Sequence, residues 1–146
     1  MVKLQEKEST ISDSEWKVMR IIWTLAPVSS TQIIHELQAK KDWSESTIKT
    51  LLRRLVQKNL LSTKKEGRRF VYTAKINQTQ VMAEAAQELL NRMCDMHKGE
   101  VLLQLLADSP ISKSDLEKMK QKISEKEKNA PDKVPCNCLP DEKHFC

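Results

Sequence analysis

Cysteines gather at the end of this sequence in a spacing that suits a metal ion. Of four cysteines among 146 residues, three fall in the last eleven positions. Cys136 and Cys138 are separated by one residue, and His144 and Cys146 repeat that separation five residues later. Three thiolates and one imidazole fit tetrahedral Zn(II), and thiolates also favour Cu(I). The pattern therefore predicts that Cys136, Cys138, His144 and Cys146 bind a metal.

Other interpretations of these residues stay open. His144 is the weakest member of the set. Without it, the three thiolates would be completed by Cys94, by a cysteine of a partner chain or by solvent. Cys94 follows Met93 near a helix end, where a small buried hydrophobic residue is the simpler interpretation. The tail cysteines could also be incidental.

The sequence lacks the patterns of catalysis and of export. No C-x-x-C pair, Ser/His/Asp set, pair of acid/base carboxylates or phosphate-binding loop is present, so we expect no enzyme. The first ten residues have no apolar signal core, and no apolar run is long enough to cross a bilayer. We therefore expect a cytoplasmic protein without a membrane partner.

A second group of residues has the types expected for contact with nucleic acid. Residues 49–75 carry nine basic side chains and one acid, Glu66, whereas the whole chain has a net charge of +5. This local excess of positive charge predicts phosphate binding, with a basic surface kept for solubility as the alternative. The side chains that we expect to contact double-stranded DNA are Ser46, Thr47, Lys49, Thr50, Arg53, Arg54, Lys64, Lys65, Arg68 and Arg69.

A predicted helix over residues 43–59 positions six of these ten side chains. Ile48, Leu52 and Leu55 recur on one face at helical spacing, and Ser44 is placed to cap the start. The opposite face carries short hydroxyls near its beginning and cations further along. A helix with one apolar face and one such polar face suits the major groove of DNA.

Two shorter helices are expected before this one. Ser12 with Glu15 forms a capping box that starts a helix over residues 13–25, which ends before Pro27. Ser29 starts a second helix that runs to about Ala39. Three short helices, the third with a cationic outer face, are typical of a helix-turn-helix domain.

The sequence changes to a strand pattern after the third helix. Residues 60–63 and 68–73 are rich in β-branched and aromatic side chains, and residues 64–67 join them with a glycine. A β-hairpin here would be the wing of a winged helix-turn-helix domain over residues 11–75, packed on the helices through Leu61, Phe70 or Tyr72. The expected fold class is mainly α.

Residues 76–127 predict three more helices, with a break at Gly99 and a cap at Ser112. About fifty residues are too few to bury so much apolar surface alone, so we expect a dimerisation domain. A monomer whose helices fold back on the head is the alternative. Residues 1–10 are expected to be a polar arm and residues 128–146 a flexible metal-binding tail. The expected interface residues are Val81, Leu89, Val101, Leu102, Leu105, Leu106, Leu116, Met119 and Ile123.

Three stretches of the sequence resemble the penicillinase-repressor family of winged-helix repressors. They are IxxxEWxVMRIIW at residues 11–23, DWSESTIKTLLRRLVQKNLL at residues 42–61 and GRRFVYTA at residues 67–74. The cysteine tail is most similar to that of the copper-responsive (CopY-type) branch. His144 departs from that branch, because it stands where the third of four tail cysteines is expected.

The resemblance implies a function as well as a fold. It implies a homodimer that represses copper-efflux genes. Zn(II) would favour operator binding, and Cu(I), delivered by a copper chaperone, would replace it and release the DNA. It places Ser46, Thr47, Lys49 and Thr50, with Arg53 nearby, in the major groove.

Two other functions remain as alternatives. The β-lactam-responsive branch is released by cleavage of an Asn-Phe bond, and the corresponding pair here is Gln104-Leu105. This departure favours metal control over proteolysis. A module for protein interaction or metal buffering that binds no DNA is the third possibility.

Overall fold

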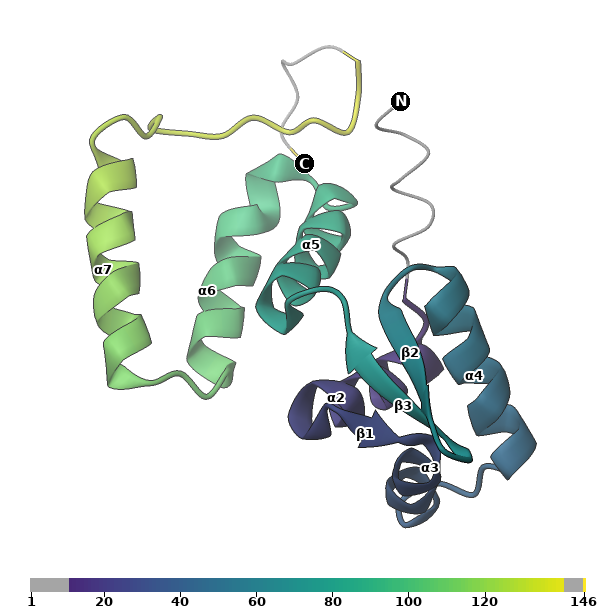
Figure 1. Ribbon diagram of the computed structural model, residues 1–146. Coiled ribbons are helices and arrows are strands. Elements are labelled where there is room, and N and C mark those ends of the chain that lie inside the picture. The colour runs from purple at the N-terminus through teal and green to yellow at the C-terminus, as the bar shows by residue number, and fades with distance from the viewer. Residues whose placement is uncertain (1–10, 141–145) are drawn as a thin grey trace. The chain divides into compact units, whose positions relative to one another are not determined.

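The computed structural model describes residues 11–140 and Cys146, so the predicted N-terminal arm and His144 lie outside the described residues. The chain divides into two compact units, residues 1–85 and 86–146. The first unit, called the head below, contains α2 (Asp13–Leu25), β1 (Val28–Ser29), α3 (Ser30–Gln38), α4 (Glu45–Gln57), β2 (Leu61–Glu66) and β3 (Arg69–Ala74) (Figure 1). Helix α5 (Gln78–Asn91) begins in the head and ends in the second unit.

Serine side chains cap four of the helices. In each case the hydroxyl oxygen accepts a hydrogen bond of 3.1–3.2 Å from the backbone N–H three residues further on. These hydrogen bonds satisfy N–H groups that the helix itself leaves unpaired, and a cap of this kind is worth about 1 kcal/mol. The predicted helix starts are therefore confirmed. The capping residues are Ser12, Ser29, Ser44 and Ser112.

The core of the head forms where the apolar faces of the three helices meet. Ile22, Ile33 and Ile48, one from each helix, have no exposed surface. The helix that the sequence predicts over residues 43–59 thus buries the expected face. The Trp23 indole N–H donates a 3.0 Å hydrogen bond to the Ile76 carbonyl, which ties the chain entering α5 to α2. The wholly or nearly buried apolar residues of this core are Val18, Met19, Ile22, Val28, Ile33, Leu37, Ile48, Leu51, Leu52, Leu55, Leu60 and Leu61.

The end of α4 sets the direction of the hairpin. Asn59 adopts a φ of +64°, and the N–H of Leu60 donates to the Leu55 carbonyl at 3.0 Å. This left-handed cap stops the helix and satisfies one of its last carbonyls. Leu60 and Leu61 are each 2% exposed, so the first hairpin strand starts inside the core. Leu61 is thus one of the residues that hold the wing on the helices, as predicted.

The sheet differs from the predicted two-stranded hairpin in two ways. Val28 and Ser29 form a short strand that pairs with Tyr72 and Val71 of β3, which gives the antiparallel order β1-β3-β2. Two residues are too few for a periodic signal, and their pairing is a long-range contact. The connection is also shorter than the expected loop over residues 64–67. Strand β2 runs on to Glu66, and the turn is Gly67 with the next residue, Gly67 having a φ of +62° that favours glycine.

An ion pair joins two helices inside the head. The side chain of Glu15 on α2 is only 3% exposed, and both of its oxygens lie 2.8 Å from the Lys58 ammonium at the end of α4. Burial raises the pKa of the Glu15 carboxyl, but hydrogen bonds from Lys58 and Ser12 outweigh that effect, so the pKa lies below its ordinary value of 4.5. The ionised carboxylate therefore stabilises the folded head.

Glu15→Gln is expected to lower the free energy of unfolding of the head by about 1–3 kcal/mol at pH 7. Because the folded pKa is lowered, the carboxylate's contribution is present above about pH 4.5 and is lost as the pH falls through the folded pKa. The difference between wild type and variant should shrink over that range. Urea unfolding followed by tryptophan fluorescence measures it, since all three tryptophans lie in the head. A difference that stayed constant with pH would contradict this assignment.

The second unit is helical but has little core of its own. It contains the end of α5, the single turn η1 (Asp95–His97), α6 (Lys98–Asp108) and α7 (Lys113–Glu127), followed by residues without helix or strand up to residue 140. None of the described residues of α6 and α7 is buried. The predicted break at Gly99 is wrong, because Gly99 lies in the first turn of α6. No helix among the described residues is long and apolar enough to cross a membrane.

Candidate DNA-binding surface and metal centre

The outward face of α4 presents the hydroxyl and cationic side chains that the sequence predicts. Ser46, Thr47, Lys49, Arg53 and Arg54 are exposed, and Thr50 is half-buried. The buried face of the same helix holds Ile48, Leu52 and Leu55, which are at most 1% exposed. Packing of that face against the head therefore leaves the polar face free for a ligand.

The polar side chains on this face form only local contacts, with residues of the same helix or its cap. The hydroxyls of Ser44 and Thr47 lie 2.9 Å apart, and the Thr50 hydroxyl donates to the Ser46 carbonyl at 3.0 Å. Lys49 contacts Glu45 at 3.0 Å, with both side chains about 60% exposed. A solvent-exposed ion pair of this kind contributes little to stability. The Lys49 ammonium can therefore leave the Glu45 carboxylate and bind a phosphate instead.

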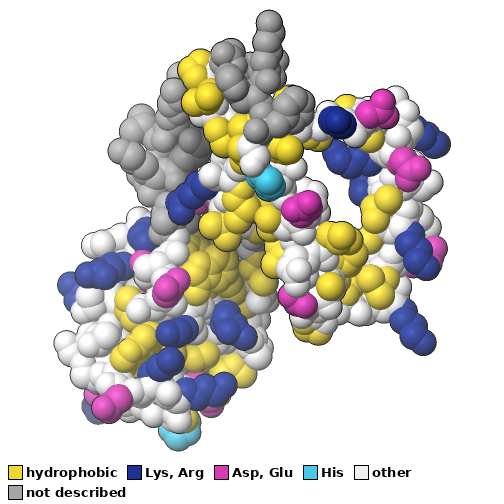
Figure 2. Space-filling view, turned by 180° about the vertical axis from the view of Figure 1, so that it is seen from behind, with side chains coloured by type: hydrophobic (Ala, Val, Ile, Leu, Met, Phe, Trp, Pro, Cys, Tyr) yellow, Lys and Arg dark blue, Asp and Glu magenta, His cyan; other side chains and the backbone are white. Residues whose placement is uncertain are grey.

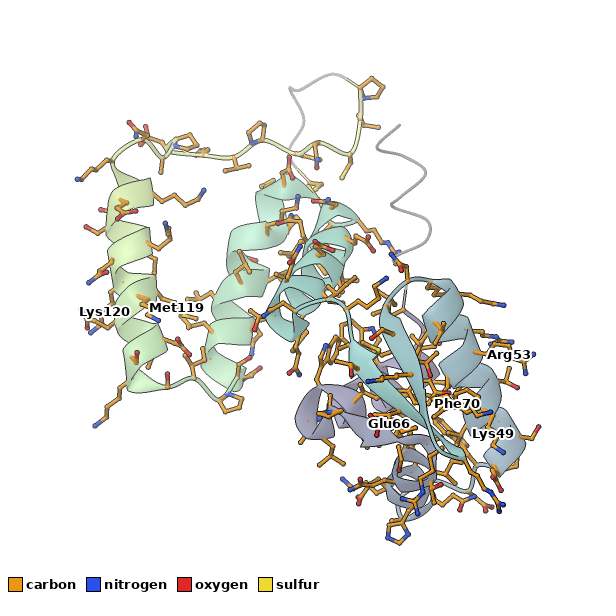
Figure 3. All side chains as sticks on the ribbon, viewed as in Figure 1. Lys49, Arg53, Glu66, Phe70, Met119 and Lys120 are labelled. Atoms are coloured by element: carbon orange, nitrogen blue, oxygen red, sulfur yellow. The ribbon has the colours of Figure 1, made fainter. Side chains whose placement is uncertain are left out.

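A groove runs between α4 and the hairpin wing (β2 and β3), and cations line it from both sides. Lys49 and Arg53 come from α4, Arg68 comes from the hairpin turn, and Phe70 and Tyr72 come from β3. Figure 3 shows Lys49, Arg53 and Phe70 on this side of the head, and Figure 2 shows Lys and Arg side chains spread over the head's surface. A cation-lined groove with a partly aromatic wall suits the sugar-phosphate backbone of a duplex.

The strand register assigns the other predicted cations of the wing to the two faces of the hairpin. Lys65 lies opposite Phe70 and therefore on the groove face of the hairpin, because side chains of directly paired residues share a face. Lys64 and Arg69 occupy the other face, where Arg69 is paired with Glu66. The structure thus brings some of the predicted wing cations to the groove but not all of them.

Two features of the groove were not predicted from the sequence. Ser30 and Thr31, at the start of α3, also line it. Phe70, which the sequence analysis considered as a packing residue, is 48% exposed there. Its strand position opposite Lys65, a residue that must reach solvent, is the signal that could have indicated exposure.

All four cysteines come together in the second unit. Their sulfur atoms all lie within 4.8 Å of one another, with Cys94 and Cys146 at 3.2 Å and Cys138 and Cys146 at 3.9 Å. All four are free thiols. Four sulfurs arranged tetrahedrally about 2.3 Å from a zinc ion would stand about 3.8 Å apart, so the cluster needs only a small adjustment to hold one. These four cysteines could bind a metal ion.

The position of Cys94 corrects one sequence-based interpretation. Cys94 is half-buried beside three other thiols, rather than an isolated hydrophobic residue. Nothing in the sequence pattern near Cys94 indicates this, because its partners follow more than forty residues later. In the described part of the tail Cys136 is only 2% exposed, whereas the other residues of 128–140 are exposed.

The crowding of thiols changes their acidity. A hydrogen bond from the Cys146 thiol lowers the pKa of Cys94 to about 6. Hydrogen bonds within the cluster, first with Cys136, raise the pKa of Cys138 to about 11, and the bond with Cys94 raises that of Cys146 to about 12. One thiolate thus forms readily, and further thiolates beside it are disfavoured without a cation. A bound metal removes that penalty by deprotonating its thiol ligands.

Comparison with known proteins identifies the family. The sequence profile of the penicillinase repressor family matches residues 11–125. The chain belongs to the penicillinase repressor family. As a family member it is a DNA-binding transcriptional repressor and not an enzyme.

Two relatives known from sequence cover most of this repressor, and a solved DNA-binding domain covers about half of it. It is 45% identical over 137 residues to a 16.5 kDa protein in the ptsI 3′ region of Latilactobacillus sakei, covering 94% of both chains. It is 34% identical to the penicillinase repressor of Bacillus licheniformis over 124 residues, 85% of this chain and 96% of the relative. The solved DNA-binding domain of the repressor BlaI is 43% identical, covers 48% of this chain and 85% of that one, and gives a TM-score of 0.46.

Proposed function

We propose that this repressor is controlled by a metal ion. As a homodimer with Zn(II) at its cysteine site it binds an inverted-repeat operator, and Cu(I) replaces Zn(II) and releases the DNA. The controlled genes would then serve copper efflux and homeostasis. The four-thiol cluster carries this proposal, because thiolates are the soft ligands that favour Cu(I) and also hold Zn(II). Cys136, Cys138 and Cys146 lie beyond the residues that the family profile matches, which fits a separate signal-sensing part.

The apolar surface of the second unit supports the homodimer. Leu89, Leu102, Leu105 and Ile123 are 49–56% exposed, and Val101 is half-buried. Leu106, Leu116 and Met119 are 37–39% exposed and line a groove along α7 together with Ile123. Figure 2 shows hydrophobic side chains on the surface of this unit. A second copy would cover them, and a two-fold dimer would present its heads to two half-sites. Val81 differs from the other predicted interface residues, because it is 6% exposed in a single chain.

A binding titration with each metal tests the proposal. Full-length protein loaded with Zn(II) is titrated against a labelled duplex from its own upstream region, and Cu(I) is then added without oxygen. We expect Cu(I) to weaken binding by about 5–150-fold, the usual range of coupling between two sites. A double Cys136→Ser and Cys138→Ser variant should bind the duplex only as well as the metal-free protein does, and Cu(I) should leave that affinity unchanged. Unchanged affinity after Cu(I) addition would overturn the metal-controlled release.

The relatives' names support a second candidate function. Penicillinase repressors and a methicillin resistance regulatory protein are among them, which suits release by proteolysis in response to β-lactams. The corresponding bond, between Gln104 and Leu105, lies in α6, and both side chains are exposed. Intact-mass measurement during the Cu(I) titration separates the two functions, since metal control predicts release of an uncut chain. Delivery of Cu(I) by a copper chaperone and a cytoplasmic location stay predictions.

A further inference from the structure

We infer that Cys94 is the fourth ligand of the metal site, so that metal binding fastens the C-terminal segment to the connection between α5 and α6. The inference rests on the proposed function, which requires a metal at the tail cysteines, and adds a residue from outside the tail. It also assigns the metal a structural consequence within the second unit. Cys94 and Cys146 are 52 residues apart in the sequence.

The distances favour Cys94 as that ligand. Its sulfur lies 3.2 Å from the Cys146 sulfur and within 4.8 Å of those of Cys136 and Cys138. An S4 set of this kind matches the closed tetrahedral sites of structural zinc. The three tail thiols alone would leave one zinc coordination position to solvent. Cys94 fills that position within the described part of the chain.

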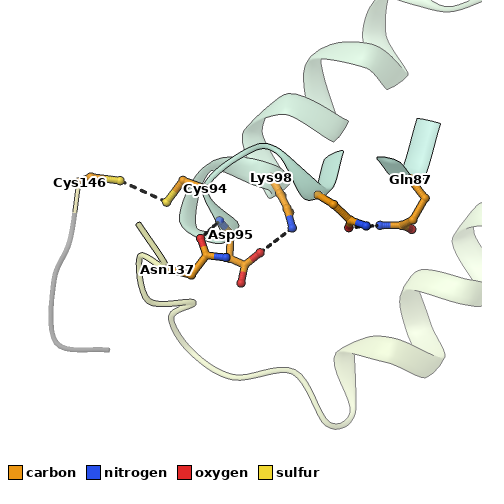
Figure 4. Close-up of polar contacts among 7 residues, drawn as sticks. Gln87, Cys94, Asp95, Lys98, Asn137 and Cys146 are labelled. Atoms are coloured by element: carbon orange, nitrogen blue, oxygen red, sulfur yellow. Dashed lines mark hydrogen bonds and ion pairs between the residues drawn. The ribbon is translucent and has the colours of Figure 1, made fainter. Parts of the chain in front are cut away.

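Hydrogen bonds hold the tail against Cys94 independently of the sulfurs. The backbone N–H of Asp95 donates to the side-chain oxygen of Asn137 at 2.9 Å, and Asn137 is the residue between Cys136 and Cys138 (Figure 4). The intervening residue of the C-x-C pair therefore docks the tail on the turn that carries Cys94. Cys136, beside it, is 2% exposed. A loose tail that lay near Cys94 by chance would not be expected to form the hydrogen bond between Asp95 and Asn137.

The turn that carries Cys94 is itself well positioned. The Cys94 carbonyl accepts a 3.1 Å hydrogen bond from the His97 N–H, which starts η1. Asp95 forms a 2.5 Å ion pair with Lys98, the first residue of α6. Cys94 thus lies in the short connection between the last residue of α5 and the first of α6. A metal that binds Cys94 and the tail together restrains this connection as well as the tail.

Differential alkylation of the full-length chain tests the inference. The metal-free and Zn(II)-loaded proteins are treated with N-ethylmaleimide for timed intervals, and each cysteine is quantified by peptide mass spectrometry. We expect Zn(II) to slow the alkylation of all four cysteines by at least about tenfold, since ligand thiolates are shielded by the metal. Protection of Cys136, Cys138 and Cys146 with Cys94 still reactive would overturn the inference and leave the proposed function standing. Protection of none would overturn the proposed function itself.

Zinc competition with matched variants gives a second measurement. Cys94→Ser should weaken Zn(II) binding by more than the about 10–100-fold that loss of an outer-shell partner costs. His144→Ala, which removes the other candidate for the fourth ligand, should change it by less than about threefold. Circular dichroism checks that both variants keep their helices. The reverse order of the two effects would exclude Cys94 as the ligand.

Discussion

Replacing Arg53 and Arg68 together by alanine is expected to weaken duplex binding by on the order of 10²-fold near 100 mM salt. The two guanidinium groups reach the same groove from α4 and from the wing turn. Each charge-assisted hydrogen bond to a phosphate is worth about 1.5 kcal/mol or more, which is about tenfold in affinity. Loss of two phosphate contacts should also make the dependence of log K on log salt shallower by about 2.

Fluorescence anisotropy at several salt concentrations measures both effects on the upstream duplex. Arg20→Ala with Lys41→Ala is the matched control, because these two exposed cations also lie on the head but line a different pocket. The control pair should keep most of the affinity and the steep salt dependence. Equal losses in the two double variants would mean that the general charge of the head, and not the groove, binds DNA.

Met119→Asp is expected to convert the proposed homodimer to a monomer and to lower affinity for a complete inverted repeat by about 10²–10⁴-fold. Met119 is 39% exposed in a single chain, so the substitution adds little strain to the fold of one copy. At a two-fold interface, however, every substitution appears twice, and two carboxylates would be buried close together. In a dimer, binding of one head raises the effective concentration of the other head at the second half-site. A monomer carries one head and loses this gain.

Sedimentation equilibrium gives the oligomeric state, and titration of full and half operator duplexes gives the two affinities. Gln121→Asp is the matched control, since it adds the same charge two residues away, on another side of α7 that is also exposed. In Figure 3 Met119 lies on the side of α7 that is turned toward α6, and Lys120 points away from it. Half-site affinity should be the same in both variants. A Met119→Asp chain that remained dimeric would place the interface elsewhere.

Local chemistry explains why the helices could be predicted from the sequence. A capping serine accepts a hydrogen bond from the backbone N–H three residues away. The helix starts at Ser12, Ser44 and Ser112 can therefore be predicted without any tertiary contact. The helical spacing of Ile48, Leu52 and Leu55 likewise predicts which face of α4 is buried, without knowledge of what packs against that face. The polar face opposite follows from the same periodicity.

Strand pairing decided what the sequence analysis missed in the head. Strand β1 has only two residues and exists because Val28 pairs with Tyr72. The exposure of Phe70 follows from the register that sets it opposite Lys65 on the groove face. Neither follows from periodicity along one strand, because each depends on which residue of the neighbouring strand lies alongside.

The sequence by itself therefore determined the class of the head, the cationic face of α4 and the thiol chemistry of the tail. Each of these depends on residue types within one turn of helix or within a few positions. Only the tertiary structure decided that Arg53 and Arg68 share one groove and that Cys94 joins the tail thiols. The physical reason is that a shared site depends on distances between atoms that chain folding brings together, and a 52-residue separation carries no local signal of it.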